Sequence, residues 1–408
     1  MRKRIIIDRA DRLYQMPRAT EDYYPQPSPL GGKKSEILDL GRPIWGPTAI
    51  GTDDSGVASA PISLEPASDG EMSALRQAIA DWSSRELAVK LNPDREVLIG
   101  ASVRDLLSLI GLAYLDPGDL ALYPNPGYPA YRQTILTYGA EPVGYHLTHK
   151  REFKPRLKQF SERIGRAAHS LFINNPHNPS GADLEMEELD ELLWLAARDN
   201  LMLINDAAYM AFSGCDDVSL MGSPSGKRIG IECYSLTYLA GGSRIPVGFA
   251  IGSKDLISGL KAAARIRGDR PLSHRAKRAV SVLEDYPSTQ LLAMRARIRD
   301  TWTPAHELCE ALGLKPVGRA GFPYLLARTP RRTSSQASAA TILRRYGLVT
   351  LPAAAFGDLG EGYLRLALTS GPLLYREALE RVKSRRLRAG EDAPDPGTPL
   401  ESLWTRFE

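Results

Sequence analysis

The chain has 408 residues, of which 43% are hydrophobic and 25% charged, and this composition suits a globular protein with two domains and one large shared core. Its formal net charge of +4 gives no support to a nucleic-acid-binding role, which needs a concentrated basic face. No apolar run approaches the roughly 20 residues of a membrane span, and the basic first residues lack the apolar stretch of a secretory signal, so we expect a cytoplasmic protein that binds no membrane.

The order of periodic segments predicts an α/β fold. Residues 1–45 are rich in proline, tyrosine and charge and predict an arm that lies over another surface. Helical spacing of apolar residues follows at 71–87 and 103–115. Helices then alternate with apolar strands, which predicts a mostly parallel sheet covered on both faces. The expected strands are 120–124, 141–147, 170–175, 201–206, 231–236 and 247–252.

The pattern changes after a helical stretch at 274–298. Residues 313–388 predict strand, strand, helix, strand, strand, helix, which is typical of a smaller α+β domain. We therefore expect four parts, listed in chain order: an arm (1–45), a large domain (46–300), a small domain (301–390) and a loose tail (391–408).

Polar and aromatic residues follow three of the expected strands, where ligands of open α/β sheets bind. Asn178, in the loop "NNPHNPSG" (174–181), can present its amide to a ligand or simply make the turn. Asp206 ends a buried strand, where it needs a cationic partner such as a protonated ring nitrogen, unless it caps a helix. Tyr209 can reach the same ligand or pack in the core. Tyr128 can stack on a planar ligand, although packing explains it equally well.

Seven short motifs occur in one order along the chain, and each is weak alone. They are "LRQAI" (75–79), "DPGD" (116–119), "GYPAY" (127–131), "NPSG" (178–181), "NDAAY" (205–209), "AGGSR" (240–244) and "GYLRLAL" (362–368). Together they resemble the fold-type I pyridoxal-phosphate (PLP) enzymes of the class I/II aminotransferase group, most closely its LL-diaminopimelate aminotransferase-like branch. The resemblance implies a seven-stranded, mostly parallel sheet in the large domain, and a homodimer whose cleft lies at the subunit boundary.

The resemblance also implies a role for individual residues. The implied cofactor contacts are Asn178 and Tyr209 at the phenolic oxygen, Asp206 at the pyridine nitrogen, Tyr128 on the ring, and Ser235 and Arg244 at the phosphate. Arg365 would bind the α-carboxylate of a small amino-acid-like substrate through a bidentate pair. Its place within the apolar alternation "YLRLAL" favours a buried anion site over a surface charge.

The segment "YSLTYLAGGSRIPVGF" (234–249) departs from the family. Relatives read Ser-Leu-Ser-Lys-Thr-Tyr, whereas here Ser235-Leu236 is followed directly by Thr237-Tyr238, and no lysine lies between Arg228 and Lys254. The spacing from Thr237 to Arg244 matches the family, so we interpret the difference as deletion of the Ser-Lys pair. Lys254 begins the next expected helix and is a poor substitute.

The missing lysine ordinarily forms the internal aldimine and moves the substrate proton, so its loss predicts that ordinary transamination fails. Tyr238 and Tyr209 remain as catalytic candidates, but a phenol forms no imine and its pKa of about 10 makes it a reluctant base. Ser102-Val103-Arg104 stands where relatives have Gly-Ser-Lys, which puts valine at a hydroxyl position of the anion cup. The stretch 62–76 also lacks a tyrosine that relatives send to the neighbouring subunit's phosphate.

Three hypotheses follow. The chain is a diverged biosynthetic enzyme that holds PLP or pyridoxamine phosphate (PMP) noncovalently; or its pocket takes another cofactor or none; or it is an inactive subunit that supports a partner. Haem is one alternative cofactor, because His177 and Cys233 flank the altered region and can in principle ligate iron. Both also have an ordinary explanation, since Cys233 lies in a strand and histidine occurs at the position of His177 in ordinary relatives. Cys215, Cys233 and Cys309 are widely spaced and predict neither a disulfide framework nor a metal site.

Overall fold

The structure is a computed structural model. It describes residues 37–45, 65–156, 160, 162–215, 218–243, 245–268 and 270–388. Most of the expected arm, the expected tail and Arg244 therefore lie outside the described residues. No helix within the described ranges is long and apolar enough to cross a membrane.

A seven-stranded sheet forms the larger layer of the molecule, with strand order β2-β8-β7-β6-β5-β3-β4. Its strands are β2 (Val97–Gly100), β3 (Leu120–Asn125), β4 (Glu141–His146), β5 (Ala168–Asn174), β6 (Met202–Asp206), β7 (Gly230–Ser235) and β8 (Gly248–Gly252). The five strands from β7 to β4 are parallel, whereas β8 is antiparallel to both of its neighbours. The predicted mostly parallel sheet is confirmed; β2, with four residues, is too short to stand out in the sequence.

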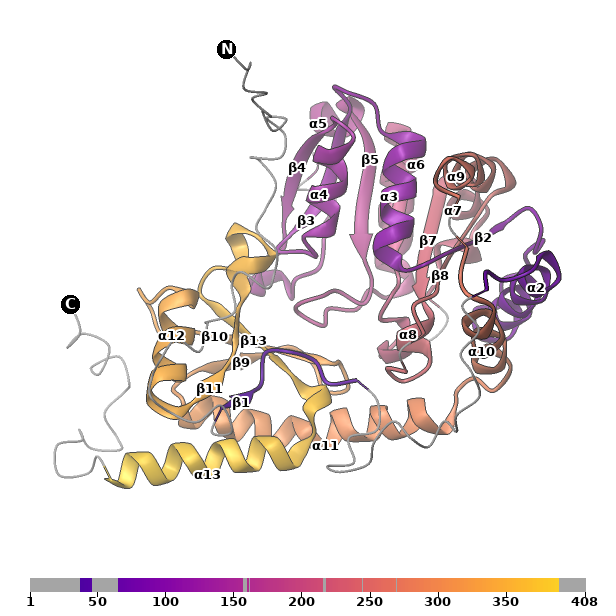
Figure 1. Ribbon diagram of the computed structural model, residues 1–408. Coiled ribbons are helices and arrows are strands. Elements are labelled where there is room, and N and C mark those ends of the chain that lie inside the picture. Colours follow the sequence, from indigo (N-terminus) through magenta and orange to yellow (C-terminus); the bar gives the residue numbers. More distant parts are fainter. Residues whose placement is uncertain are drawn as a thin grey trace, which may run out of the picture.

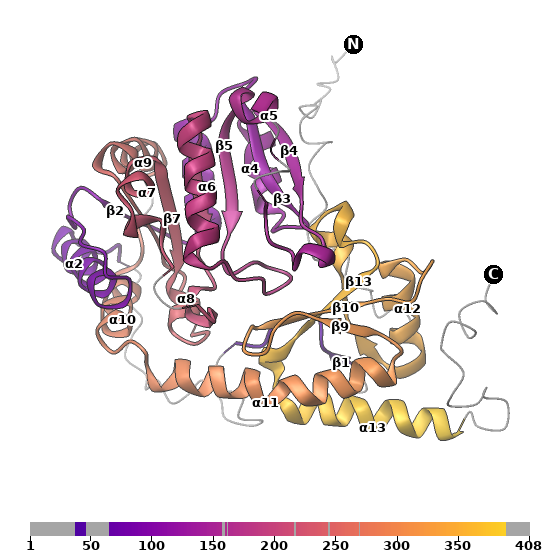
Figure 2. The same cartoon turned by 180° about the vertical axis from the view of Figure 1, so that it is seen from behind.

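Helices cover both faces of this sheet (Figures 1 and 2). One face carries α3 (Val103–Tyr114), α4 (Ala130–Thr137) and α9 (Lys254–Arg267), and the other carries α5 (Glu162–Ala167), α6 (Met186–Asp199) and α7 (Pro224–Ile229). At the β2 edge, α2 (Asp69–Glu86) packs against α10 (Ser273–Glu284). Apolar residues at helical spacing account for the buried faces, as in α3, where Leu106, Leu107 and Ile110 are buried.

A smaller antiparallel sheet, in the order β12-β13-β10-β9, lies at the carboxyl ends of the large sheet's strands (Figure 1). Its strands are β9 (Lys315–Val317), β10 (Tyr324–Arg328), β12 (Leu351–Pro352) and β13 (Tyr363–Ala367), and β11 (Leu348–Val349) pairs in parallel with β1 (Leu38–Asp39). The helices of this region are α11 (Thr289–Ala311), α12 (Ser335–Tyr346) and α13 (Pro372–Arg388). These elements follow the order predicted for 313–388, except that three short strands, β11, β12 and β13, lie between α12 and α13 where two were predicted.

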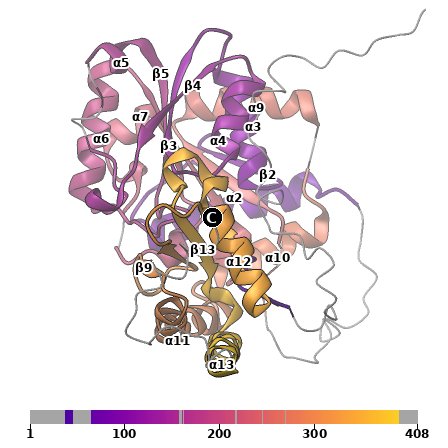
Figure 3. The ribbon, with the colours of Figure 1, turned by 90° about the vertical axis from the view of Figure 1, so that its left-hand side faces the viewer.

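The long helix α11 runs beneath both sheets and packs against α13 (Figures 1 and 2). The side view of Figure 3 shows α11 and α13 together below the large sheet. The expected domain boundary at residue 300 falls inside this helix, so the two regions share a continuous element.

Residues 37–45 cross from the small sheet toward the large one. The Leu40 amide donates to the Val349 carbonyl at 2.9 Å, and the Leu40 carbonyl accepts from the Ala367 amide at 2.7 Å. The Ile44 amide donates to Thr369 Oγ1 at 3.0 Å. Trp45 ends the segment and packs on Tyr238, which belongs to the short helix α8 (Leu236–Leu239). This part of the chain therefore borders the space between the sheets.

Candidate active site

Asp206 is a buried carboxylate at the carboxyl end of β6, with 4% of its surface exposed. Tyr131 donates its hydroxyl to one carboxylate oxygen at 2.7 Å, and the Ala208 amide donates to the other at 3.0 Å. Burial raises the pKa of Asp206 to about 6, although both hydrogen bonds act in the opposite direction. No described cation forms an ion pair with it. The site is therefore suited to a ligand atom that carries positive charge, such as a protonated ring nitrogen.

Asn178 is fixed beside Asp206 by the loop that follows β5. The backbone amide of Asn178 donates to Asn174 Oδ1 at 2.7 Å, and Asn174 Nδ2 donates to the backbone carbonyl of Asp206 at 2.7 Å. Asn178 Oδ1 in turn accepts a hydrogen bond from Arg365 Nη1 at 3.2 Å. The fold thus joins two predicted site residues that lie 187 positions apart.

Arg365 lies on β13 and is 6% exposed. Its guanidinium carbon is 4.0 Å from the ring centre of Tyr324 and 4.9 Å from that of Phe356, so aromatic faces hold it on two sides. Nη2 reaches the Gly41 carbonyl at 3.4 Å, but Nε is buried without a partner, and no described carboxylate pairs with this arginine. A buried guanidinium without an anion is the arrangement expected of a carboxylate-binding site.

Tyr128 stands just past the end of β3, half-buried, with its ring at 81° to that of Tyr131 and 5.9 Å from it. Its hydroxyl accepts two hydrogen bonds from Arg104, from Nη2 at 2.7 Å and from Nε at 3.2 Å. Burial raises the pKa of Tyr128, while Arg104 opposes the shift. Arg104, from the first turn of α3, is thereby brought to the same edge of the sheet.

The two predicted catalytic phenols are in contact. Tyr209 and Tyr238 stack with ring centres 4.6 Å apart and planes at 17°, and their hydroxyls are 3.4 Å apart. The Tyr209 hydroxyl is also 3.2 Å from that of Tyr324, and the Trp45 ring lies 4.9 Å from Tyr238. Burial raises the pKa of both Tyr209 and Tyr238 well above the ordinary value, so both stay neutral and neither is suited to act as a base. The sequence interpretation missed Trp45 and Tyr324, because nothing in their local sequence marks them as site residues.

The family description "Aminotransferase class I and II" matches residues 67–382. The chain belongs to the class I and II aminotransferases. It is 31% identical over 365 residues to an LL-diaminopimelate aminotransferase of Syntrophobacter fumaroxidans, covering 87% of this chain and 92% of the relative. It is 33% identical over 328 residues to the same-named protein of Moorella thermoacetica, covering 78% and 82%. The resemblance inferred from the seven motifs is confirmed.

Solved structures show the same fold. An aminotransferase from Staphylococcus aureus superposes with a TM-score of 0.77 at 24% identity, over 93% of this chain and 100% of that one. Substrate-bound BacF from Bacillus subtilis superposes with a TM-score of 0.74 at 23% identity, over 86% of this chain and 91% of that one. The fold is therefore that of the PLP-dependent, fold-type I aminotransferases.

Lys254 of this aminotransferase lies at the wrong edge of the sheet to replace a cofactor-binding lysine. Because β8 runs antiparallel to β7, Gly248 pairs with Ser235 but Gly252 pairs with Ile231. Lys254 follows Gly252 as the exposed first residue of α9. Asp206 pairs with Cys233, which lies two residues, or roughly 7 Å, along β7 from Ile231, and Lys254 lies two residues beyond Gly252 in the opposite direction.

The two segments for which the resemblance implies contact with a phosphate meet at this edge. Ser235 ends β7, and its side chain makes no capping bond to α8. Gly248, opposite Ser235, touches the start of α3, where an added Cβ would lie 2.8 Å from the Ser102 carbonyl carbon. Ser102 Oγ caps α3 by accepting the Asp105 amide at 3.1 Å, and Val103 is buried and offers no hydroxyl. The phosphate role predicted for Ser235 stays a prediction, and Arg244 lies outside the described residues.

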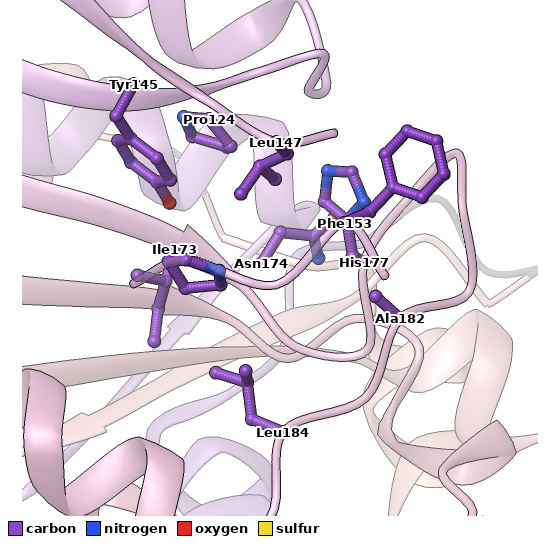
Figure 4. A pocket seen from close by; sticks show the side chains of 10 residues that line it. Pro124, Tyr145, Leu147, Phe153, Ile173, Asn174, His177, Ala182 and Leu184 are labelled. Atoms are coloured by element: carbon purple, nitrogen blue, oxygen red, sulfur yellow. The ribbon is translucent and has the colours of Figure 1, made fainter. Parts of the chain in front are cut away.

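His177 and Cys233, the alternative haem ligands, are both buried, and both ring nitrogens of His177 have protein partners. His177 Nδ1 is 2.6 Å from Ser180 Oγ and Nε2 is 3.0 Å from the Pro126 carbonyl, and burial lowers its pKa to about 4. The ring lines a small cavity beside Asn174 (Figure 4). Cys233 is fully buried within β7. Within the described part of the chain, no group of three or more His, Cys, Asp or Glu residues could hold a metal. The described geometry therefore lends the haem alternative no support.

Proposed function

We propose that this chain is a diverged, aminotransferase-fold biosynthetic enzyme that acts on an amino-acid-like carboxylate substrate and is not an ordinary transaminase. The observation that carries the proposal is the position of its lysines. None lies between Arg228 and Lys254, and Lys254 begins α9 at the opposite edge of the sheet from Asp206. A lysine-bound cofactor has no attachment point in this segment.

The described residues suit a pyridine ring that is held by noncovalent contacts alone. Asp206 is buried and has no cationic partner among the described residues, and burial raises its pKa. A protonated ring nitrogen beside it would lower the cost of this burial. Asn178 and Tyr128 border the same edge. Ser235 and the start of α3 offer few side-chain groups for a phosphate, as Val103 shows. We therefore propose that PLP or PMP binds noncovalently, with Asp206 as the main determinant of its orientation.

A bound PLP or PMP would supply an electron-accepting ring, and the protein's own residues would set its surroundings. Asp206 would keep the ring nitrogen protonated, and Arg365 would orient the substrate's carboxylate through charge-assisted hydrogen bonds. Tyr209 and Tyr238 would act as neutral hydrogen-bond groups, because burial keeps them protonated. With no amine or other strong base among these residues, proton transfer at the substrate's α-carbon would be slow.

The test uses full-length protein incubated with PLP and then treated with borohydride. We expect PLP to be removable by dialysis and to leave no pyridoxyl adduct on the peptide between residues 228 and 253. Weaker PLP binding by an Asp206→Asn variant would support the proposed orientation. A stable adduct on Lys254 would overturn the proposal and return the chain to ordinary aminotransferases.

A second candidate function is a cofactor-free subunit that supports an active partner. It is favoured by Val103 in the anion cup and by the Tyr209–Tyr238 stack, which leaves two phenols packed on each other. Absence of both PLP and PMP binding in equilibrium dialysis would select it. We also propose a homodimer, since each family pocket is completed by a neighbouring chain. A monomer in sedimentation at micromolar concentration would contradict that assembly.

A further inference from the structure

A second cavity, of about 520 Å³, lies where the loop after β5 meets the turn between β9 and β10, and Asp206 is not among the residues of its wall. Its walls come from four segments, 149–154, 180–185, 214–215 and 317–319. Phe153 and Ala182, which Figure 4 shows near His177, also line the smaller cavity, so the two cavities are neighbours. The volume lies within the range of small-molecule sites.

Asp183 is a buried carboxylate in the wall of this cavity, with 6% of its surface exposed. One carboxylate oxygen, Oδ2, accepts from the Gly214 amide at 2.6 Å, from Ser213 Oγ at 2.9 Å and from Arg319 Nη2 at 3.0 Å. The other oxygen, Oδ1, is buried and has no hydrogen-bond partner. Burial raises the pKa of Asp183 despite these donors. Oδ1 therefore carries an uncompensated burial cost, which an ammonium group that reached it would lower.

The charges around the cavity also favour a cation. Of the two cationic side chains in its wall, Lys154 is held by Glu188 at 2.7 Å and Arg319 by Asp183. Glu152 is exposed and forms no ion pair with any described residue. The Glu185 carboxylate caps the first turn of α6 by accepting a backbone hydrogen bond. Because both cations are paired, the carboxylates of Glu152 and Glu185 leave the wall with a net negative charge. His149 lies on the rim of the cavity.

We propose that this cavity binds a small organic cation, a primary alkylammonium or diamine, with one ammonium group at Asp183 and the rim carboxylate of Glu152 facing the other end. Phe153, Ala182 and Val317 supply apolar wall for the methylene chain. The cavity would bind the diamine whether or not PLP binds beside Asp206.

Hydrogen bonds from Arg319 connect this cavity to the loop that carries Asn178. Arg319 donates to the Gly181 carbonyl at 3.0 Å as well as to Asp183, so it ties the β9–β10 turn to the loop that carries Asn178. An ammonium group at Asp183 competes with Arg319 for the same carboxylate. Occupancy of the cavity therefore alters the tether that holds this loop, and we expect ligands of the two sites to influence each other's affinity.

The test is a calorimetric titration of the full-length protein at neutral pH with 1,5-diaminopentane, with 1,5-pentanediol and glutarate as neutral and anionic controls of the same length. We expect saturable binding of the diamine alone. Asp183→Asn should weaken it about tenfold, as befits loss of a charged hydrogen-bond partner. Glu152→Gln, at an exposed position, should weaken it about threefold. Glu187→Gln, an exposed glutamate of α6 outside the cavity wall, should leave it unchanged.

Two results would overturn the proposal. One is an absence of diamine binding, or equal binding of the diol. The other is binding that survives in Glu152→Gln but is lost in Arg365→Leu, which would place the diamine in the cleft. If Asp183→Asn does not fold, Glu152→Gln alone decides between these outcomes. PLP binding and the borohydride result should be the same in Glu152→Gln as in the parent chain, so failure here is separable from failure of the proposed function.

Discussion

Asp206 and the short helix α8 lie at the same edge of one sheet, but the two places differ in how their residues are held. At the Asp206 end, hydrogen bonds from Tyr131 and Asn174 tie the site to the core. At the α8 end, the chain makes a four-residue helix and then a turn through Gly241 and Gly242, both with positive φ. Two residues removed at the start of so short a helix would cost the fold little, whereas loss of a hydrogen-bond partner of Asp206 would leave a buried group unsatisfied. This contrast gives a physical reason why the proposed loss of the Ser-Lys pair would leave the surroundings of Asp206 intact.

The largest effect should come from rebuilding the α8 end. Inserting Ser-Lys between Leu236 and Thr237 restores the family spacing ahead of Arg244 and puts an amine at the edge that carries Asp206. We expect a borohydride-stable pyridoxyl adduct on the inserted lysine, detected by mass spectrometry of the digest. Inserting Ser-Ala provides the matched control of equal length and should give no adduct. An inserted lysine that remains unmodified at saturating PLP would show that the altered phosphate contacts also block the site.

The next effect should come from Asp206, at the retained end. Its folded-state pKa of about 6 exceeds the ordinary 3.8, so the folded chain holds an extra proton between these values and loses stability as pH rises through this window. Asp206→Asn removes the charge but can still bond to Tyr131 and the Ala208 amide. We expect it to raise the free energy of unfolding by about 3 kcal/mol at pH 7 and by little below pH 4, while PLP affinity falls.

Denaturant unfolding at the two pH values measures this change. Asp69→Asn, at an exposed position on α2, is the control and should shift stability equally little at both. A variant that is less stable than the parent at pH 7 would contradict the raised pKa.

A third change tests the substrate side of the retained end. Arg365→Leu removes the buried guanidinium and should weaken binding of a carboxylate substrate by about 1.5–3 kcal/mol, the worth of a charge-assisted pair. Calorimetry with the true substrate, or with a PMP–carboxylate conjugate, measures it. Arg328→Leu, on the exposed end of the neighbouring strand β10, is the matched control and should leave affinity unchanged. Equal affinity in the two variants would remove Arg365 from the site.

The smallest effect concerns the contact between the two ends. Tyr324→Phe keeps the ring that faces Arg365 but removes the hydroxyl 3.2 Å from that of Tyr209. We expect a loss of about 0.5–1.5 kcal/mol in the free energy of unfolding, the usual net worth of one hydrogen bond. Tyr363→Phe, on β13, serves as the control and should change stability by less. A Tyr324→Phe variant as stable as that control would show that the Tyr209–Tyr324 contact contributes nothing.

The sequence predicted the sheet and the positions of Asp206 and Asn178 at or just after strand ends, because these depend on local apolar runs and the residues that follow them. It predicted neither the Asn178–Arg365 bond nor the Tyr209–Tyr238 stack, since each joins residues far apart in the chain through side-chain orientation. Trp45 was hidden within an arm of little periodicity, and Tyr324 within the ordinary strand segment "PYLLA". The cavity around Asp183 depends on four separate segments, so no local pattern could indicate it.

The helix α11 has a mechanical consequence for the whole molecule. As one rod of 23 residues it is roughly 35 Å long, and it has one half beneath each sheet. Pro304 lies within it and cannot donate a backbone hydrogen bond to the carbonyl of Asp300. The turn between these residues is therefore the point of lowest bending stiffness along the rod. If the two sheets open and close against each other, we expect α11 to bend in this turn, at a buried proline and not in a surface loop.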